Sequence, residues 1–176
     1  MSKLALSALT LALGLSVAPS AFALNGSSIE LGTGDSSTDM ISVALRWNWD
    51  KRWMLGRSWN LTGFWETSLG YWDGDGQGAK NLWDVGITPV FRLSPNLSRF
   101  FLEAGIGVHL LSEKKINDKR EFGSHFSFGD HIGFGWLLGE KDRYELGYRF
   151  QHLSNAGLSD PNDGINFHQI RLGYNY

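Results

Sequence analysis

A histidine and a serine, His152 and Ser154, stand two residues apart in the stretch QHLSNAGLSDPNDGIN. On a β-strand, residues i and i+2 point to the same face, so the two side chains would be neighbours on a strand. A histidine placed there can take the proton of the serine hydroxyl, which makes the hydroxyl a nucleophile for acyl transfer. The plain alternative is that both residues suit a membrane rim, where water and lipid headgroups begin.

Segments along the whole chain alternate between apolar and polar or small residues, which is typical of β-strands with two different faces. In residues 99–111, RFFLEAGIGVHLL, one parity holds Glu103, His109 and the two glycines, and the other holds Phe100, Leu102, Ala104, Ile106, Val108 and Leu110. The same alternation runs through residues 41–49, 59–71, 83–92 and 122–136. With residues 28–32, 142–153 and 165–176, these segments predict eight strands, and no segment has a convincing helical period.

The polar faces carry too many charges for the core of a soluble protein, where burying unpaired charge is costly. A narrow barrel lumen can hold them if acids and bases pair, and the bulky apolar faces then lie against lipid. The pattern predicts the all-β class: an eight-stranded antiparallel transmembrane β-barrel of the outer membrane, with an interior filled by side chains. The charged residues expected in the lumen are Glu30, Arg46, Glu66, Asp84, Glu103, Glu145, Arg149 and Arg171.

Residues 1–23 are interpreted as a secretory signal peptide. Lys3 precedes an apolar run that is too short for a transmembrane helix, and Ala21-Phe22-Ala23 gives a small-x-small cleavage pattern. The barrel domain is therefore expected to span residues 24–176. Because the chain has no cysteine and a net charge of −2, neither thiolate chemistry nor nucleic-acid binding is expected.

The expected barrel also gives the His-Ser pair a place relative to the membrane. Bacterial barrels have periplasmic termini, short periplasmic turns and longer outer loops. The outer loops are then residues 33–39, 73–81, 112–121 and 154–164, so His152 lies at the outer end of its strand. The parity of the last two strands places His152, Ser154, Asn166 and His168 on the lipid-facing surface, where polar groups are costly and indicate function. Asp130 also falls on the apolar parity of its strand, for which a bulge or a rim site are the two explanations.

The motif His-x-Ser-Asn-Ala-Gly (152–157), followed by Pro-Asn-Asp-Gly (161–164), resembles the lipid A 3-O-deacylases of Gram-negative outer membranes. The segments WNWD (47–50) and EAGIGV (103–108) and the order of strands extend this resemblance over the mature chain. It implies a cofactor-independent carboxylic ester hydrolase that removes the 3-position acyl chain of lipid A in lipopolysaccharide. It also implies an active site that faces the outer leaflet.

Carried over residue by residue, the resemblance implies that Ser154 is the nucleophile and His152 the general base. Asn155 and the backbone around Gly157 would donate hydrogen bonds to the oxyanion, and losing such a donor typically costs about 10²–10³-fold in rate.

One position departs from the family pattern, because Asn166 stands where an acid completes the triad. An amide can orient an imidazole but cannot stabilise imidazolium as a carboxylate does. The amide oxygen of Asn166 is expected to accept from His152, and Asn166→Asp or Asn166→Glu to preserve or raise activity. Asp160 and Asp163 are alternative partners, although acids in such a loop commonly form turns.

Other polar residues have weaker signals. His168 is a candidate accessory contact, and the basic loop residues are either solvated or near lipopolysaccharide phosphates. The remaining histidines have lumen parity but lack a recognisable metal-ligand spacing, so no metal site is expected. The basic residues in question are Lys114, Lys115, Lys119 and Arg120, and the histidines are His109, His125 and His131.

Two other classes of function remain open on the residues alone. A non-catalytic barrel for adhesion or envelope integrity explains the strands but leaves the lipid-facing His-Ser-Asn group unexplained. A phospholipase or acyltransferase barrel would use the same group on a different lipid. The acyl-chain preference and the question of a homo-oligomer are not decided by the residues.

Overall fold

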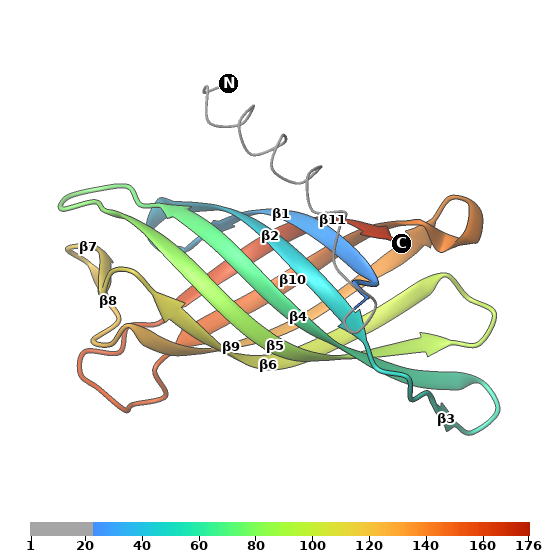
Figure 1. Ribbon diagram of the computed structural model, residues 1–176. Coiled ribbons are helices and arrows are strands. Elements are labelled where there is room, and N and C mark those ends of the chain that lie inside the picture. Colours follow the sequence, from blue (N-terminus) through green and yellow to red (C-terminus); the bar gives the residue numbers. More distant parts are fainter. Residues whose placement is uncertain (1–22) are drawn as a thin grey trace.

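The computed structural model describes residues 23–176, so the predicted signal peptide lies outside the described residues except for its last residue. Eight long antiparallel strands close into a barrel (Figure 1). The strands are β1 (Gly26–Gly34), β2 (Thr38–Asn48), β4 (Trp59–Asp73), β5 (Asn81–Pro95), β6 (Phe100–Leu111), β9 (Phe126–Leu138), β10 (Tyr144–Ser154) and β11 (Ile165–Asn175). The first strand pairs with both β2 and β11, which closes the sheet and confirms the predicted fold class.

Short elements lie in the connections between the long strands. Strand β3 (Trp53–Leu55) pairs with the start of β4, and β7 (Lys115–Asn117) and β8 (Arg120–Glu121) form a small hairpin between β6 and β9. The single-turn 3₁₀ helices η1 (Asp35–Ser37) and η2 (Glu140–Asp142) join β1 to β2 and β9 to β10. None of the helices in residues 23–176 has the length and apolar character needed to cross a membrane.

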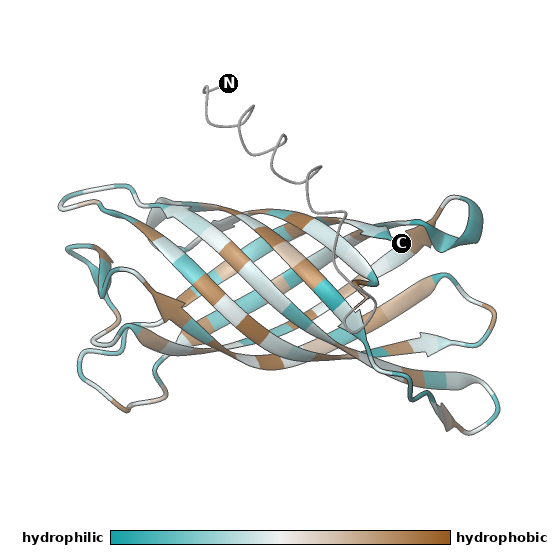
Figure 2. Ribbon diagram, in the orientation of Figure 1, coloured by the Kyte–Doolittle hydropathy of each residue, from teal (hydrophilic) through white to brown (hydrophobic). Residues whose placement is uncertain are grey.

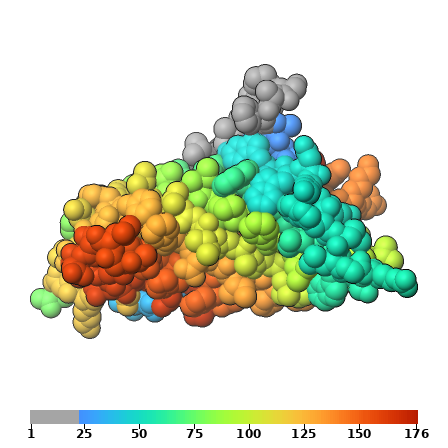
Figure 3. Space-filling view, turned by 90° about the horizontal axis from the view of Figure 1, so that it is seen from below, coloured from blue at the N-terminus to red at the C-terminus, as the bar shows by residue number. Residues whose placement is uncertain are grey.

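The four connections predicted to lie outside gather at one end of the barrel, and the C-terminus lies at the other end (Figure 1). The β10–β11 connection, residues 155–164, carries the motif that comes after the His-Ser pair. In the space-filling view its orange-red atoms form a compact patch at this end of the molecule (Figure 3).

Apolar and polar residues alternate along the strands (Figure 2), and large apolar side chains are exposed along the outer surface of the barrel wall. The predicted parity is confirmed by Ile106, Ile132 and Leu172, which are 67%, 64% and 53% exposed in the isolated chain. In a membrane this surface lies against acyl chains, which accept apolar side chains without loss of free energy.

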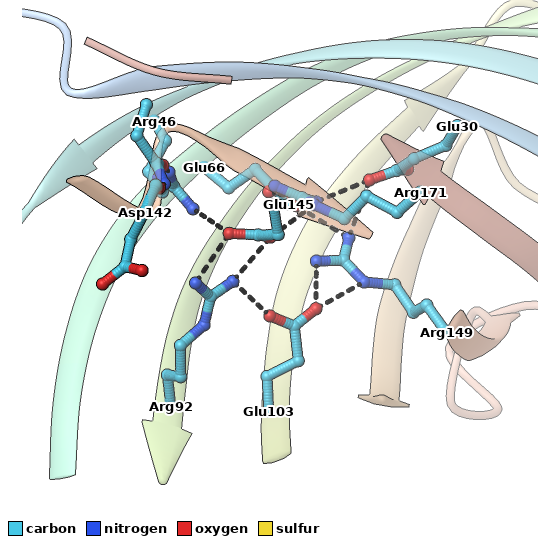
Figure 4. A network of polar contacts seen from close by, with 10 residues as sticks. Glu30, Arg46, Glu66, Arg92, Glu103, Asp142, Glu145, Arg149 and Arg171 are labelled. Atoms are coloured by element: carbon cyan, nitrogen blue, oxygen red, sulfur yellow. Dashed lines mark hydrogen bonds and ion pairs between the residues drawn. The ribbon is translucent and has the colours of Figure 1, made fainter. Parts of the chain in front are cut away.

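Inside the barrel, charged side chains form one network (Figure 4). Arg149 contacts Glu66 and Glu103 at 2.8 Å, and Arg92 contacts Glu103 and Glu145 at the same distance. The other members are Glu30, Arg46 and Arg171. Four arginines thus face four glutamates, so the lumen buries these charges as pairs, as predicted.

The outer end of the lumen is apolar instead of polar, which the alternation did not predict. A cluster, here called the outer cap, fills it and contains Met40, Trp72, Leu82, Leu111, Ile116, Phe122, Leu153, Ile165 and Phe167. The Trp72 ring lies 4.8 Å from Phe167 and 6.1 Å from Phe122, measured between ring centroids.

Two predicted positions in residues 122–125 were wrong, because β9 begins only at Phe126. Phe122 was expected to face lipid, but it lies in the preceding connection and is buried in the outer cap. His125 was expected to face the lumen, but it is exposed and hydrogen-bonds the Leu111 carbonyl through Nδ1 at 2.7 Å.

Candidate active site at the outer end of β10 and β11

The outer cap packs against the inner side of the strands that carry the site. Leu153, Ile165 and Phe167 point into it and are at most 1% exposed. Because side chains alternate along a strand, their neighbours His152, Ser154 and Asn166 point to the outer surface, and all three are half-buried. The site residues therefore stand on backbone that well-packed apolar side chains hold in place.

The structure brings His152 and Asn166 together as direct partners in the β10–β11 register. His152 Nδ1 and Asn166 Oδ1 are 2.8 Å apart, which is the contact expected from the sequence. Ser154 lies two residues further along the same face of β10. No direct hydrogen bond joins Ser154 to His152, and such bonds in substrate-free hydrolases are often long until substrate binds.

Asn166 has a second partner that the sequence did not reveal. Its side-chain Nδ2 donates to Asp35 Oδ2 at 2.9 Å, and its backbone N–H donates to the same oxygen at 3.0 Å. Asp35 begins the β1–β2 connection and is 131 residues from Asn166 in the sequence. The pairing of β1 with β11, in which Gly34 faces Phe167, places them together.

A second acid flanks the site on β9. Asp130, whose outward parity was unexplained, is the register partner of His152 across the β9–β10 pair, and it is exposed. Side chains at such directly opposed positions have Cβ atoms about 4.5–5.5 Å apart. His152 therefore lies between Asn166 on β11 and Asp130 on β9. The outward position of Asp130, on the apolar face of its strand, places this acid next to the site.

The predicted oxyanion donors, Asn155 and Gly157, have hydrogen-bond partners within the β10–β11 connection. Asn155 is fully buried, and its Nδ2 donates to the carbonyls of Phe122 at 2.8 Å and Ser159 at 2.7 Å. Its Oδ1 accepts the Gly157 N–H at 2.8 Å, so that donor is also used. An amide has two N–H donors, and both are occupied here. Asn155 holds the loop together through these bonds, and the oxyanion role of Asn155 and of the backbone around Gly157 stays a prediction.

The backbone of Gly164 lies next to His152 and Ser154. Nothing in the sequence singled out this glycine beyond its place in the PNDG motif. Its φ of +58° is in the left-handed region, which glycine adopts at little cost. A Cβ atom at this position would lie 3.0 Å from His152 Cε1 and 3.4 Å from Ser154 Cβ. The absence of a side chain here leaves room for the imidazole.

The two alternative acids lie elsewhere in the loop. Asp163 Oδ2 accepts the Glu121 N–H at 2.7 Å, and the Asp163 N–H donates to the Glu121 carbonyl at 3.1 Å. These bonds dock the loop onto the β7–β8 hairpin. Asp160 is exposed, and its backbone packs against Gly123. Neither acid hydrogen-bonds His152, whereas Asn166 does.

His168 pairs with a neighbour on the lipid-facing surface, since its Nδ1 lies 2.6 Å from the Tyr148 hydroxyl.

Acids partly neutralise the basic outer loops. Lys115 contacts Asp118 at 3.0 Å, and Lys80 contacts Glu113 at 2.6 Å, where its hydrogen bond lowers the pKa of the Glu113 carboxyl. Arg120 turns inward and donates to Ser36 Oγ and to the carbonyls of Asp163 and Gly164.

Residues 23–176 contain no cluster of three or more acidic or histidine side chains that could hold a metal ion. In the lumen, His109 Nδ1 lies 2.9 Å from Asp84 Oδ1, and His131 is buried.

Comparisons with known proteins identify the family of this chain. The family model described as lipid A 3-O-deacylase (PagL) matches residues 39–175. The lipid A deacylase PagL of Bordetella bronchiseptica is 36% identical over 173 residues, which cover 95% of this chain and 92% of the relative. The protein of the same name from Pseudomonas aeruginosa is 36% identical over 145 residues, covering 81% and 82% of the two chains.

A solved structure agrees in its fold as well. The crystal structure of the outer membrane enzyme PagL superimposes with a TM-score of 0.78 at 33% identity, and the match covers 86% of this chain and 99% of that one. The chain belongs to the PagL family of lipid A 3-O-deacylases.

Proposed function

We propose that this protein hydrolyses the ester of the 3-O-linked acyl chain of lipid A, with Ser154 as nucleophile and His152 as general base. The observation that carries the proposal is the bond of 2.8 Å between His152 and Asn166 on the lipid-facing surface, beside Ser154. A catalytic group buried in the lumen could not meet a membrane lipid, whereas this one faces the outer leaflet of the outer membrane. The family supports lipid A as the substrate.

The chemistry depends on the free Nε2 atom of His152. As Ser154 Oγ attacks the ester carbonyl, its proton passes to Nε2 and a bond forms between Oγ and the carbonyl carbon. The bond from that carbon to the sugar oxygen then breaks, and this oxygen takes the proton from His152 and leaves as a hydroxyl. Water next attacks the acyl-serine, with His152 again as the base, and releases the fatty acid and free Ser154.

Lipid A mass spectrometry tests the proposal in cells with and without the protein. The parent protein should remove one acyl chain from lipid A. Ser154→Ala and His152→Ala should each lower the rate by about 10⁴-fold or more, and the double variant should be little worse, because the two groups act as a unit. His125→Ala, at an exposed position whose Nδ1 hydrogen-bonds the Leu111 carbonyl and none of the three site residues, is the control and should keep parent activity.

Each other outcome contradicts the proposal. Full deacylation by Ser154→Ala would exclude it as nucleophile. Unchanged lipid A in cells with the folded parent protein would favour a non-catalytic barrel, and gain or exchange of an acyl chain would favour an acyltransferase. Loss of acyl chains from phospholipids alone would indicate a phospholipase.

A further inference from the structure

The hydrogen bonds around Asn166 determine which way its side chain points. An amide can be placed with its oxygen and nitrogen exchanged, and the surrounding partners decide between the two orientations. The partner on one side is the carboxylate of Asp35, and a carboxylate only accepts hydrogen bonds. The atom that contacts Asp35 Oδ2 at 2.9 Å must therefore be the amide nitrogen, and the oxygen faces His152.

This orientation also determines the tautomer of His152. An amide oxygen only accepts hydrogen bonds, so His152 Nδ1, at 2.8 Å from it, must carry the proton. The neutral imidazole then has its lone pair on Nε2, which is the form that can take a proton from Ser154. With the amide reversed, Nδ1 would face a donor and Nε2 would carry the proton instead.

We propose that Asp35 is a positioning residue that completes a chain Ser154–His152–Asn166–Asp35, supplying from the β1–β2 connection the carboxylate missing at position 166. This proposal rests on the proposed function. Asp35 orients the amide, and Asn166 separates its negative charge from the imidazolium that forms on His152 during the reaction.

Asp35 is held where this role requires it. The backbone N–H and the side-chain Nδ2 of Asn166 both donate to the same carboxylate oxygen, which holds Asp35 against the start of β11. Arg120 Nη2 lies 3.7 Å from that oxygen and joins this connection to residues 163 and 164. The Asp35 side chain is 37% exposed, and Arg120 offsets part of its charge. Orientation of the amide is therefore expected to outweigh the direct effect of charge.

The test measures kcat and KM of purified, folded variants on lipopolysaccharide in detergent micelles, with Ser154→Ala as the inactive reference. Asp35→Ala should lower kcat by about 10- to 100-fold, the usual effect of losing an outer partner, and leave KM within about twofold. Asp35→Asn keeps an oxygen acceptor and should lie between this variant and the parent. Asp39→Asn, an exposed acid nearby on β2, should behave as the parent.

The decisive variant moves the carboxylate. In Asp35→Ala/Asn166→Asp, an acceptor-only group lies directly against His152 Nδ1, so kcat should recover to well above that of Asp35→Ala. Three results would each overturn the role of Asp35. They are an unchanged kcat in Asp35→Ala, a change in KM alone in Asp35→Ala, and a double variant whose kcat is no higher than that of Asp35→Ala. An active Ser154→Ala would instead overturn the proposed function, so the two failures are distinguishable.

Discussion

At the residue scale, His152 is available as a base only through Nε2, because Asn166 occupies Nδ1. Asn166→Ala removes this partner but leaves the imidazole in place. We expect kcat to fall by about 10- to 100-fold, which is less than the loss in Ser154→Ala, because His152 remains as a poorly oriented base. Kinetics on the same lipopolysaccharide substrate, with all variants at equal folded concentration, measure the difference.

The structure changes the result expected for Asn166→Asp in the parent chain. Preserved or higher activity was expected when only His152 was considered. Because the Asn166 side chain lies 2.9 Å from Asp35, a carboxylate at position 166 would face a like charge. Like charges at this distance repel, so this single variant should now lose activity. Activity above the parent level would show that Asp35 moves away without consequence.

The site residues differ in how far the sequence could reveal them. His152, Ser154 and Asn166 share the outward parity of two consecutive strands, so spacing alone placed them on one face. Asp35 has no such signal, because its contact with Asn166 depends on how the first strand closes onto the last. The position of Asp130 was visible as an acid on an apolar face, but its neighbour across β9 and β10 was not.

At the scale of elements, eight strands were predictable because each wall segment separates apolar from polar residues. The pattern failed where strands pass into connections. There, inward positions such as Trp72, Leu82 and Phe122 are apolar, since they fill the outer cap rather than face the polar lumen. The short pairs β3, β7 and β8 carry too few residues for an alternation to be recognised.

The β10–β11 connection provides a test of the role of Asn155. Asn155→Ala removes the partners of the Phe122 and Ser159 carbonyls and of the Gly157 N–H. Buried polar groups left without partners cost about 1–3 kcal/mol each, so the connection should open more often. Limited proteolysis should then cleave residues 155–164 faster than in the parent, with a parallel loss of activity.

Asp160→Ala, at an exposed position of the same connection, is the matched control and should keep the parent cleavage rate. The oxyanion role predicts a different result for Asn155→Ala, namely a lower kcat with unchanged resistance to protease. That result would support the role expected from the sequence.

At the scale of the whole molecule, the barrel separates stability from chemistry. The ion network occupies the polar part of the lumen (Figure 4), and the outer cap fills the outer end of the lumen. The site residues lie on the outer surface, next in sequence to residues of the cap. Changes in the network should therefore alter the stability of the barrel more than the geometry of His152.

Glu145 gives the sharpest test of this separation, because its side chain is 0% exposed and contacts Arg46, Arg92 and Arg171 at 3.2, 2.8 and 3.3 Å. Glu145→Gln leaves buried positive charge without its counter-charge, which should lower the free energy of unfolding by about 3–5 kcal/mol. Unfolding in urea, monitored by the shift in electrophoretic mobility of the unheated protein, measures this loss. Glu113→Gln, which breaks the exposed pair with Lys80, is the control and should unfold at the same urea concentration as the parent.

Folded Glu145→Gln should deacylate lipid A at the parent rate. An unfolding transition equal to that of the parent would mean that the network does not stabilise the barrel, and a folded but inactive variant would mean that the lumen and the site are coupled through the cap.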